Sequence, residues 1–232
     1  SALAQIELDD QIIREGTGER RELLTDMELT QFAPETWDLL SDWNLASEED
    51  ELPSPDTLDG KVVLIMTFAS WYPPSMRSLG VVGRMAQERA EDGLVVIGVH
   101  DTEAYEDGVG LARDRGALFP IARDADNAFR EAMLVDQDPD FFLIDRSGQL
   151  RFADFETASL EAAVDLLLAE SREDAETLVS RIADARRRAE IEARRTARIN
   201  QQADLTNIPE VPFVMPTPEQ YALVRWPQFP RD

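Results

Sequence analysis

Residues 61–75 read KVVLIMTFASWYPPS, and this stretch decides the fold. Its first eight residues form a nearly continuous apolar run, which predicts a strand buried on both faces. Prolines follow at positions 73 and 74, and proline suits the first turn of a helix because that turn needs no amide hydrogen. We therefore expect a strand, a short turn that carries Trp71 and Tyr72, and a helix from about Pro74.

Strands and helices alternate through the following hundred residues. The predicted strands are 61–68, 94–99, 141–145 and 150–155, and the predicted helices begin near Pro74 and cover 108–115, 127–133 and 159–169. Strand and helix in alternation predict a parallel sheet with crossover connections. The polar turn at 146–149 predicts that the last two strands form a hairpin.

Several short motifs occur in a fixed order along this region. They are LDGK at 58–61, W-x-P-P-x at 71–75, GVH at 98–100, Asp138-Pro139, and FLID-x-x-G at 142–148. Over about residues 57–169 this order resembles the thioredoxin-like superfamily, especially its TlpA-like extracytoplasmic branch. The resemblance implies an α/β fold with a thioredoxin-like central mixed sheet flanked by helices. It also implies that the W-x-P-P-x turn begins a helix whose dipole stabilises a thiolate in active relatives.

The resemblance also assigns positions at the redox site. Tyr72 occupies the position of the nucleophilic cysteine, Ser75 that of the resolving cysteine, and Pro139 that of a cis proline beside the turn. The degenerate redox site is then made of Trp71, Tyr72, Pro73, Pro74, Ser75 and Pro139.

The chain contains no cysteine. Thiol-disulfide exchange needs an attacking thiolate and a second sulfur that receives the bond, and neither a phenol nor a serine hydroxyl supplies sulfur. The sequence therefore excludes this chemistry, and we expect no catalytic residue, no cofactor and no metal ligand.

The remaining use of the site is binding, and two interpretations stand side by side. Tyr72, Pro73 and Pro139 form an apolar patch that binds a peptide segment, or Tyr72 merely fills and shields the inactive site. The lone histidine, His100, follows a predicted strand, at the sheet edge where ligands bind in open α/β folds. It is either a residue of this groove or a structural or surface histidine.

Charge limits the class of partner. The 232 residues include 47 acidic and 23 basic ones, which gives a formal net charge of −24. Such a chain repels phosphate backbones, so we expect no nucleic-acid partner. No apolar stretch approaches the roughly 18–20 residues of a membrane-spanning helix. Residues 1–5 have the small-x-small pattern of a signal-peptidase site, so we expect an extracytoplasmic, periplasmic location, with a cytoplasmic one left open.

Two acidic clusters superficially suggest calcium loops. They lie at 48–51 and 124–127, and neither has the spaced oxygen ligands of an EF-hand. We interpret the first as a solvated charge run and the second as helix capping by Asp124 or Asp126.

Composition divides the chain into four segments. These are an acidic N-terminal extension at 1–57 with a short helix at 34–43, the thioredoxin-like domain at 58–169, a long amphipathic helix at 170–203, and an extended Pro-rich tail at 204–232. Ser171 and Asp174 have the spacing of a capping box, and no glycine or proline follows before Pro209. The helix has a narrow stripe of small apolar residues, so it must pack against the domain, a copy of itself or another protein.

We expect partner binding through the helix and the tail. The helix carries a local excess of arginine, and the tail carries aromatic residues among six prolines. The predicted partner-binding residues are Arg181, Arg186, Arg187, Arg188, Arg194, Arg195 and Arg198 in the helix, with Phe213, Tyr221, Trp226 and Phe229 in the tail. The arginines suit acidic protein, either of this chain or of a partner, and lipid headgroups or a merely solvated helix face are the alternatives.

The sequence thus predicts a redox-inactive binding or assembly subunit that docks on a protein partner or a larger complex, including one at a membrane surface. The partner can also be a second copy of this chain, so the prediction includes self-association. The alternatives are an enzyme or small-molecule binder that uses the groove around Tyr72 and His100, and a chaperone-like holder of unfolded chains.

Overall fold

The fold comes from a computed structural model, which describes residues 9, 11–28, 45–202 and 217. The helix expected at 34–43 lies outside these residues. The same holds for the extended tail at 204–232, apart from Thr217.

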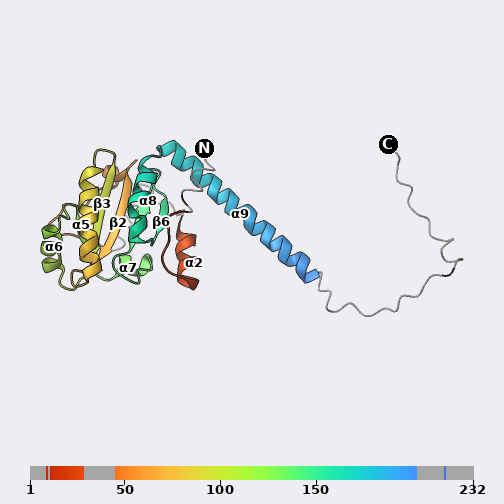
Figure 1. The fold of residues 1–232 in the computed structure, drawn as a ribbon, viewed down its shortest axis with the longest axis horizontal. Helices are drawn as coiled ribbons and strands as arrows, with labels where there is room; N and C mark the ends of the chain where they lie inside the picture. The colour runs from red at the N-terminus through yellow and green to blue at the C-terminus, as the bar shows by residue number, and fades with distance from the viewer. Residues whose placement is uncertain (1–8, 10, 29–44, 203–216, 218–232) are drawn as a thin grey trace. The chain divides into compact units, whose positions relative to one another are not determined.

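A six-stranded mixed sheet forms the centre of the molecule (Figure 1). The strands are β1 (Leu45–Ala46), β2 (Val62–Phe68), β3 (Leu94–His100), β4 (Ile121–Asp124), β5 (Phe141–Ile144) and β6 (Leu150–Ala153), in the spatial order β1-β4-β3-β2-β5-β6. Strand β3 runs parallel to both β2 and β4, whereas β5 is antiparallel to β2 and to β6. Every residue of β2 is buried, as the apolar run predicts for a central strand.

Helices connect the strands and cover both faces of the sheet. They are α2 (Gly18–Met27), α4 (Pro55–Leu58), α5 (Pro73–Glu88), α6 (Tyr105–Asp114), α7 (Ala128–Ala132), the short 3₁₀ turn η2 (Thr157–Ser159) and α8 (Leu160–Leu168). The unit β2-α5-β3 and the hairpin β5-β6 followed by α8 together give the thioredoxin-like arrangement. The expected fold class is therefore confirmed.

The two faces of β2 belong to two apolar cores. Val62, Leu64 and Met66 point to the core that α5, α6 and α8 cover, whereas Val63 and Ile65 point to the core that α2 and α7 cover. Successive side chains of β2 point to opposite faces of the sheet, so this one strand contributes to the packing of both helical layers.

One glycine allows the helical layer to pack closely. A Cβ atom on Gly83 of α5 would lie 2.3 Å from the backbone oxygen of Gly116, just after α6. Only a residue without a side chain permits this approach of helix to backbone.

The FLID-x-x-G motif has a local physical explanation in the hairpin turn. Asp145 is buried, and its Oδ1 accepts hydrogen bonds from the backbone N–H of Ser147 and of Gln149 and from the Ser147 hydroxyl. Gly148 has a φ of 82°, which glycine adopts without strain.

Part of the N-terminal extension packs on the sheet, which the sequence prediction did not include. Strand β1 pairs with β4 at one edge, and α2 lies beside β6 at the other (Figure 1). Leu24 is the buried residue of α2, so this helix has little apolar burial and depends on charged contacts.

Contacts divide the chain into two compact units, Ser1–Arg186 and Arg187–Asp232, with the division inside α9 (Arg172–Gln202). The long helix is confirmed, and so is its capping box. The Ser171 hydroxyl accepts from the Asp174 N–H at 3.1 Å, and the Asp174 carboxylate accepts from the Ser171 N–H at 3.3 Å. Ala175 and Leu178 in the first turns are buried.

Candidate functional site

The W-x-P-P-x turn joins the end of β2 to the start of α5. Tyr72 is the N-cap residue of α5, with extended backbone angles, and Pro73 follows at the first helical position. The Tyr72 N–H donates to the Ala69 carbonyl at 3.1 Å, which closes the turn. The two prolines therefore start the helix where the sequence predicts it.

This turn presents its aromatic residues to solvent. Trp71 is 67% exposed and Tyr72 is 39% exposed, and their ring centroids lie 5.9 Å apart. Pro73 is also exposed, and Pro74 is half-buried. Both rings are therefore accessible at the surface of this turn.

Ser75 points into the protein instead. It is fully buried, and its Oγ accepts a hydrogen bond from the Ala69 N–H at 3.4 Å. The hydroxyl therefore supports the turn and is not available to a ligand at the surface.

His100 is also buried, at the end of β3. Its Nε2 accepts from the backbone N–H of Ser70 at 3.1 Å, so the ring proton resides on Nδ1, which lies 2.8 Å from the Asp101 carbonyl oxygen. The ring packs edge-on against Phe68, and a Cβ atom on Gly108 would lie 2.6 Å from Nε2. Both ring nitrogens contact backbone groups, and the ring is buried. The prediction that His100 belongs to a surface groove is therefore wrong, and its role is structural.

Pro139 lies at the same end of the sheet as the turn. The Asp138-Pro139 peptide bond is cis, as the resemblance implied. Next to it, Asp140 exchanges two hydrogen bonds of 3.0 Å with Thr67 near the end of β2. Pro139 itself is half-buried, so it contributes part of an apolar surface there.

A buried ionic cluster occupies the neighbouring end of the β5-β6 hairpin. Arg20 of α2 contacts Asp136, Asp140 and Asp154 at 3.1, 3.2 and 2.6 Å, and its Nε donates to the Leu134 carbonyl at 2.7 Å. Burial and then the charge of Asp154 raise the pKa of Asp140 to about 8, against the opposing effect of Arg20.

These three carboxylates offer oxygens within 4.8 Å of one another, as a metal site would. The guanidinium of Arg20 already contacts all three, so we interpret the group as an ion cluster. Sequence analysis missed it, because Arg20 is 120 residues before Asp140 and 134 before Asp154, and no local spacing connects it to the aspartates.

A second buried arginine connects the N-terminal segment to the hairpin. Arg151 of β6 lies 2.8 Å from Asp9, 3.2 Å from Asp145 and 2.8 Å from Glu170. These acidic neighbours outweigh burial and raise the pKa of Arg151 above its ordinary range. The cluster is structural, because Arg151 is 2% exposed.

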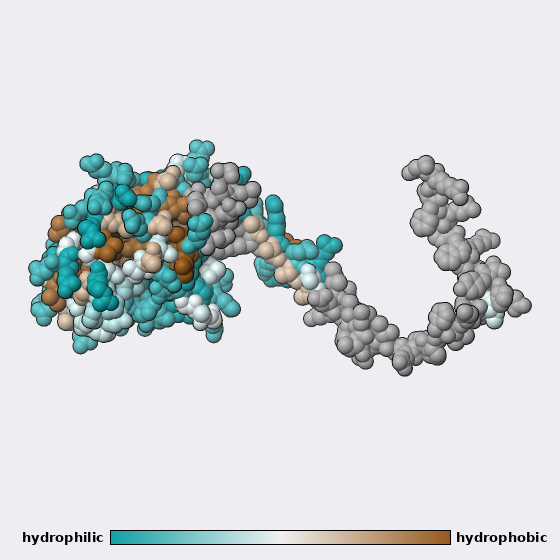
Figure 2. Space-filling view, viewed as in Figure 1, coloured by the Kyte–Doolittle hydropathy of each residue, from teal (hydrophilic) through white to brown (hydrophobic). Residues whose placement is uncertain are grey.

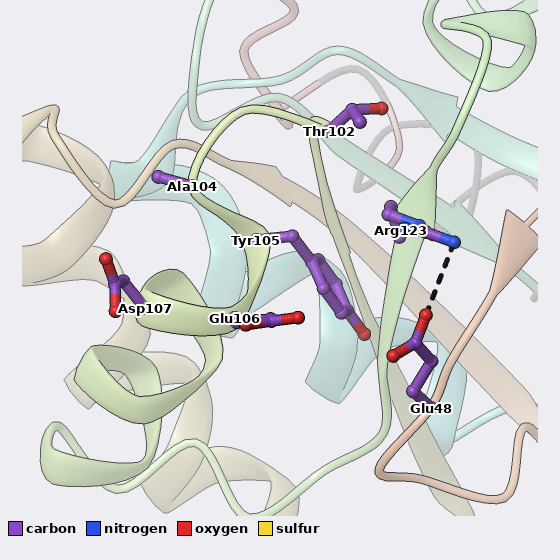
Figure 3. A pocket seen from close by; sticks show the side chains of 7 residues that line it. All are labelled: Glu48, Thr102, Ala104, Tyr105, Glu106, Asp107 and Arg123. Carbon is purple, nitrogen blue, oxygen red and sulfur yellow. Dashed lines mark ion pairs between the residues drawn. The ribbon is translucent and has the colours of Figure 1, made fainter.

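A polar pocket of about 270 Å³ lies at the start of α6 (Figure 3). Its lining residues are Glu48, Thr102, Ala104, Tyr105, Glu106, Asp107 and Arg123. Arg123 pairs with Glu48 at 3.6 Å, and the Tyr105 hydroxyl donates to the Ile121 carbonyl. Acidic side chains outnumber the single arginine, so the pocket does not suit an anion.

Asp124 confirms the capping interpretation of the second acidic cluster. Its carboxylate accepts from the N–H groups of Phe129 and Arg130 in the first turn of α7, at 3.2 and 3.0 Å. The sequence analysis left open whether Asp124 or Asp126 caps this helix, and the structure shows that Asp124 does.

The arginines of α9 are surface residues wherever their side chains are described. These exposed residues are Arg172, Arg181, Arg187, Arg188, Arg194, Arg195 and Arg198. Arg194 pairs with Glu190 at 2.5 Å and Arg195 with Glu192 at 3.9 Å, both within the helix. The side chain of Arg186 and the tail residues Phe213, Tyr221, Trp226 and Phe229 lie outside the described part of the chain.

Comparison with known proteins gives structural similarity alone. No protein-family model matches the chain, and no curated protein matches it.

Among the helices described here, none is long and apolar enough to cross a membrane.

Solved structures of thiol-disulfide proteins are similar to about half of the chain. A Chlorobium tepidum protein assigned as a thiol:disulfide interchange protein DsbE is 27% identical, with a TM-score of 0.44, over 49% of this chain and 82% of that one. A secreted Mycobacterium tuberculosis disulfide oxidoreductase homologous to E. coli DsbE is 17% identical, with a TM-score of 0.43, over 50% and 88%. A Corynebacterium glutamicum thiol-disulfide isomerase is 22% identical, with a TM-score of 0.45, over 53% and 90%.

Proposed function

We propose that this chain is a redox-inactive, thioredoxin-like binding or assembly subunit that docks on an acidic protein partner through α9 and the tail. We place it outside the cytoplasm, where the sequence pattern at residues 1–5 and the TlpA-like motifs suggest it works. One observation carries the proposal: beyond Leu178, every side chain of α9 that the structure describes is exposed.

An exposed helix of this length needs a reason to stay folded. Isolated helices are marginal in water, and most helical stability in proteins comes from packing an apolar face. Ile191 is 59% exposed in the second half of α9, and Figure 2 shows apolar and hydrophilic residues side by side along the helix. A partner that covers this stripe would supply the missing burial.

The charge of the helix suggests the chemistry of that partner. Residues 181–198 hold seven arginines and three acidic residues, an excess of four positive charges in a chain of net charge −24. Arginine forms paired hydrogen bonds with carboxylates more readily than lysine does. An acidic protein surface is therefore the complementary partner.

Charge reversal tests this function in the full chain. The test variant replaces Arg187, Arg188 and Arg195 by Glu, and the control replaces the exposed Arg77, Arg84 and Arg115 by Glu, which changes the net charge equally. Affinity capture from the native source, followed by mass spectrometry, should recover a partner with the wild type and the control. We expect at least about tenfold less partner with the test variant. Equal recovery from all three proteins would contradict docking through α9.

Truncation separates the helix from the tail. Removal of residues 204–232 should leave α9 and the sheet intact. If the truncated chain loses the partner and the charge-reversal variant of α9 keeps it, docking is assigned to the tail. Sedimentation of the purified chain determines whether the partner is a second copy.

The exposed aromatic turn supports a second candidate function, the binding of a peptide or small molecule at Trp71, Tyr72 and Pro139. The double change Trp71→Ala and Tyr72→Ala removes both exposed rings without touching the core. Loss of ligand binding with an unchanged fold would favour this function, and broad suppression of aggregation of unrelated clients would favour a chaperone-like holder.

A further inference from the structure

The end of the β5-β6 hairpin holds more negative charge than its contacts neutralise. Asp140 precedes β5 and Asp154 follows β6, and both side chains are almost completely buried, at 0% and 1% exposure. Each uses its Oδ2 to accept from Arg20 of α2, at 3.2 and 2.6 Å. One guanidinium thus serves two buried carboxyl groups and the more exposed Asp136.

The second oxygen of each buried carboxyl group lacks a donor. Neither Oδ1 of Asp140 nor Oδ1 of Asp154 has a hydrogen-bond partner among the residues that the structure describes. A buried charged oxygen without a donor is costly, because it has lost water and gained nothing in return. One proton on the pair would remove one negative charge and create the missing donor.

The other charged groups around the pair do not remove this deficit. Arg21 of α2 donates to the backbone oxygens of Ala153 and Asp154, and its charge interacts with the Asp154 carboxylate without a hydrogen bond between the two side chains among the described contacts. On α7, Arg130 pairs with Asp138. The acidic groups nearby are Glu15 and Glu156 on the flanking segments and Asp136 in the loop before Pro139.

We propose that the buried Asp140 carboxyl group, beside Asp154, holds a proton in neutral solution and releases it in mildly alkaline solution, which loosens α2 from the sheet. A carboxyl group that is buried next to a second carboxylate keeps its proton to higher pH, because both burial and the like charge disfavour its ionised form. The direction of the pKa of Asp140, raised to about 8 by burial and then by Asp154, agrees with this geometry.

Loosening follows from burial. The charge of Arg20 favours the ionised form of Asp140, but burial opposes that form more strongly. Once Asp140 is ionised, its charge regains water only if a neighbouring segment moves away, and α2 has Leu24 as its buried residue and is held by the contacts of Arg20 to Asp140, Asp154 and the Leu134 carbonyl.

Carboxyl titration by NMR tests the site directly. In the full chain labelled with ¹³C at aspartate carboxyl carbons, we expect the Asp140 resonance to titrate near pH 8. Asp140→Asn should abolish that step, because the amide imitates the protonated carboxyl group and cannot ionise. The matched control is Asp165→Asn, which removes an exposed partner of Arg89 and should leave the step unchanged.

Amide hydrogen exchange supplies the second readout. In the wild type, exchange of α2 beyond the intrinsic base-catalysed rate should accelerate as the pH passes about 8. In Asp140→Asn it should not. Titration of every aspartate in the wild type below about pH 5 would overturn the proposal, even if the variant fails to fold. A midpoint that millimolar Ca²⁺ or Mg²⁺ lowers would overturn it too, since it would assign the oxygens to a metal.

Discussion

The backbone N–H of Ser70 donates to Nε2 of His100 across 3.1 Å, which connects the aromatic turn to the buried end of β3. The lone histidine of the chain thus supports the backbone that carries Trp71 and Tyr72. The turn is therefore a stable platform for exposed rings.

His100→Ala should lower the free energy of unfolding by about 2–4 kcal/mol, because it removes a buried ring and leaves the Ser70 N–H without its acceptor. Urea denaturation measures the change. Trp71→Ala is the control, since Trp71 is 67% exposed and should change stability by less than about 1 kcal/mol. Similar effects from both changes would contradict a structural role for His100.

Gly83→Ala should destabilise the protein by about 1–3 kcal/mol, because the new methyl group would lie 2.3 Å from the Gly116 oxygen and push α5 away from the backbone after α6. Gly110→Ala in α6 is the matched control. A Cβ atom there has nothing within 4 Å, so we expect a gain of up to about 1 kcal/mol from helix propensity. Thermal unfolding of the two variants measures whether each is less stable or more stable than the wild type.

Asp140 should make the protein less stable as the pH rises. Its pKa is raised from the ordinary 3.8 to about 8 in the folded chain, so between these values the folded state holds more protons than the unfolded state. The free energy of unfolding then falls with increasing pH across that window.

Asp140→Asn should flatten this dependence relative to the wild type, and denaturant titrations at several pH values between about 4 and 9 measure it. Asp165→Asn, in an exposed pair, should keep the wild-type slope. If the wild type and Asp140→Asn have parallel curves, the carboxyl group of Asp140 is not protonated in the folded chain at neutral pH.

The double change Tyr72→Cys and Ser75→Cys should allow an intramolecular disulfide and measurable reduction of insulin. Both positions flank the first turn of α5, whose N-terminal dipole favours a thiolate. Mass spectrometry detects the loss of two hydrogens on oxidation, and the single change Tyr72→Cys is the control without a second sulfur. Absence of the disulfide under oxidising conditions would show that the turn differs from that of a working redox site.

The sequence predicted the central elements because their signals are local. Each of these signals depends on neighbouring residues: the apolar runs of β2, β3 and β5, the capping box of Ser171 and Asp174, and the prolines that begin α5. Strand β4 was missed because it has four residues, two of them charged, and follows Pro120. Helix α2 was missed because charged contacts with distant residues hold it, and such contacts leave no periodic pattern.

The candidate site was predicted in part. The cis bond at Pro139 followed from the resemblance, and the binding role of Tyr72, which is exposed, stays a prediction. The burial of Ser75 in the first turn of α5 and of His100 at the end of β3 could not be predicted, because which way these side chains face depends on packing that only the complete fold determines.

Arg20 reaches Leu134, Asp140 and Asp154, which are 114, 120 and 134 positions later in the chain. During synthesis, α2 leaves the ribosome long before any of these residues exists. Helix α2 must therefore wait for the final hairpin, and its attachment is a late step of folding that completes the domain.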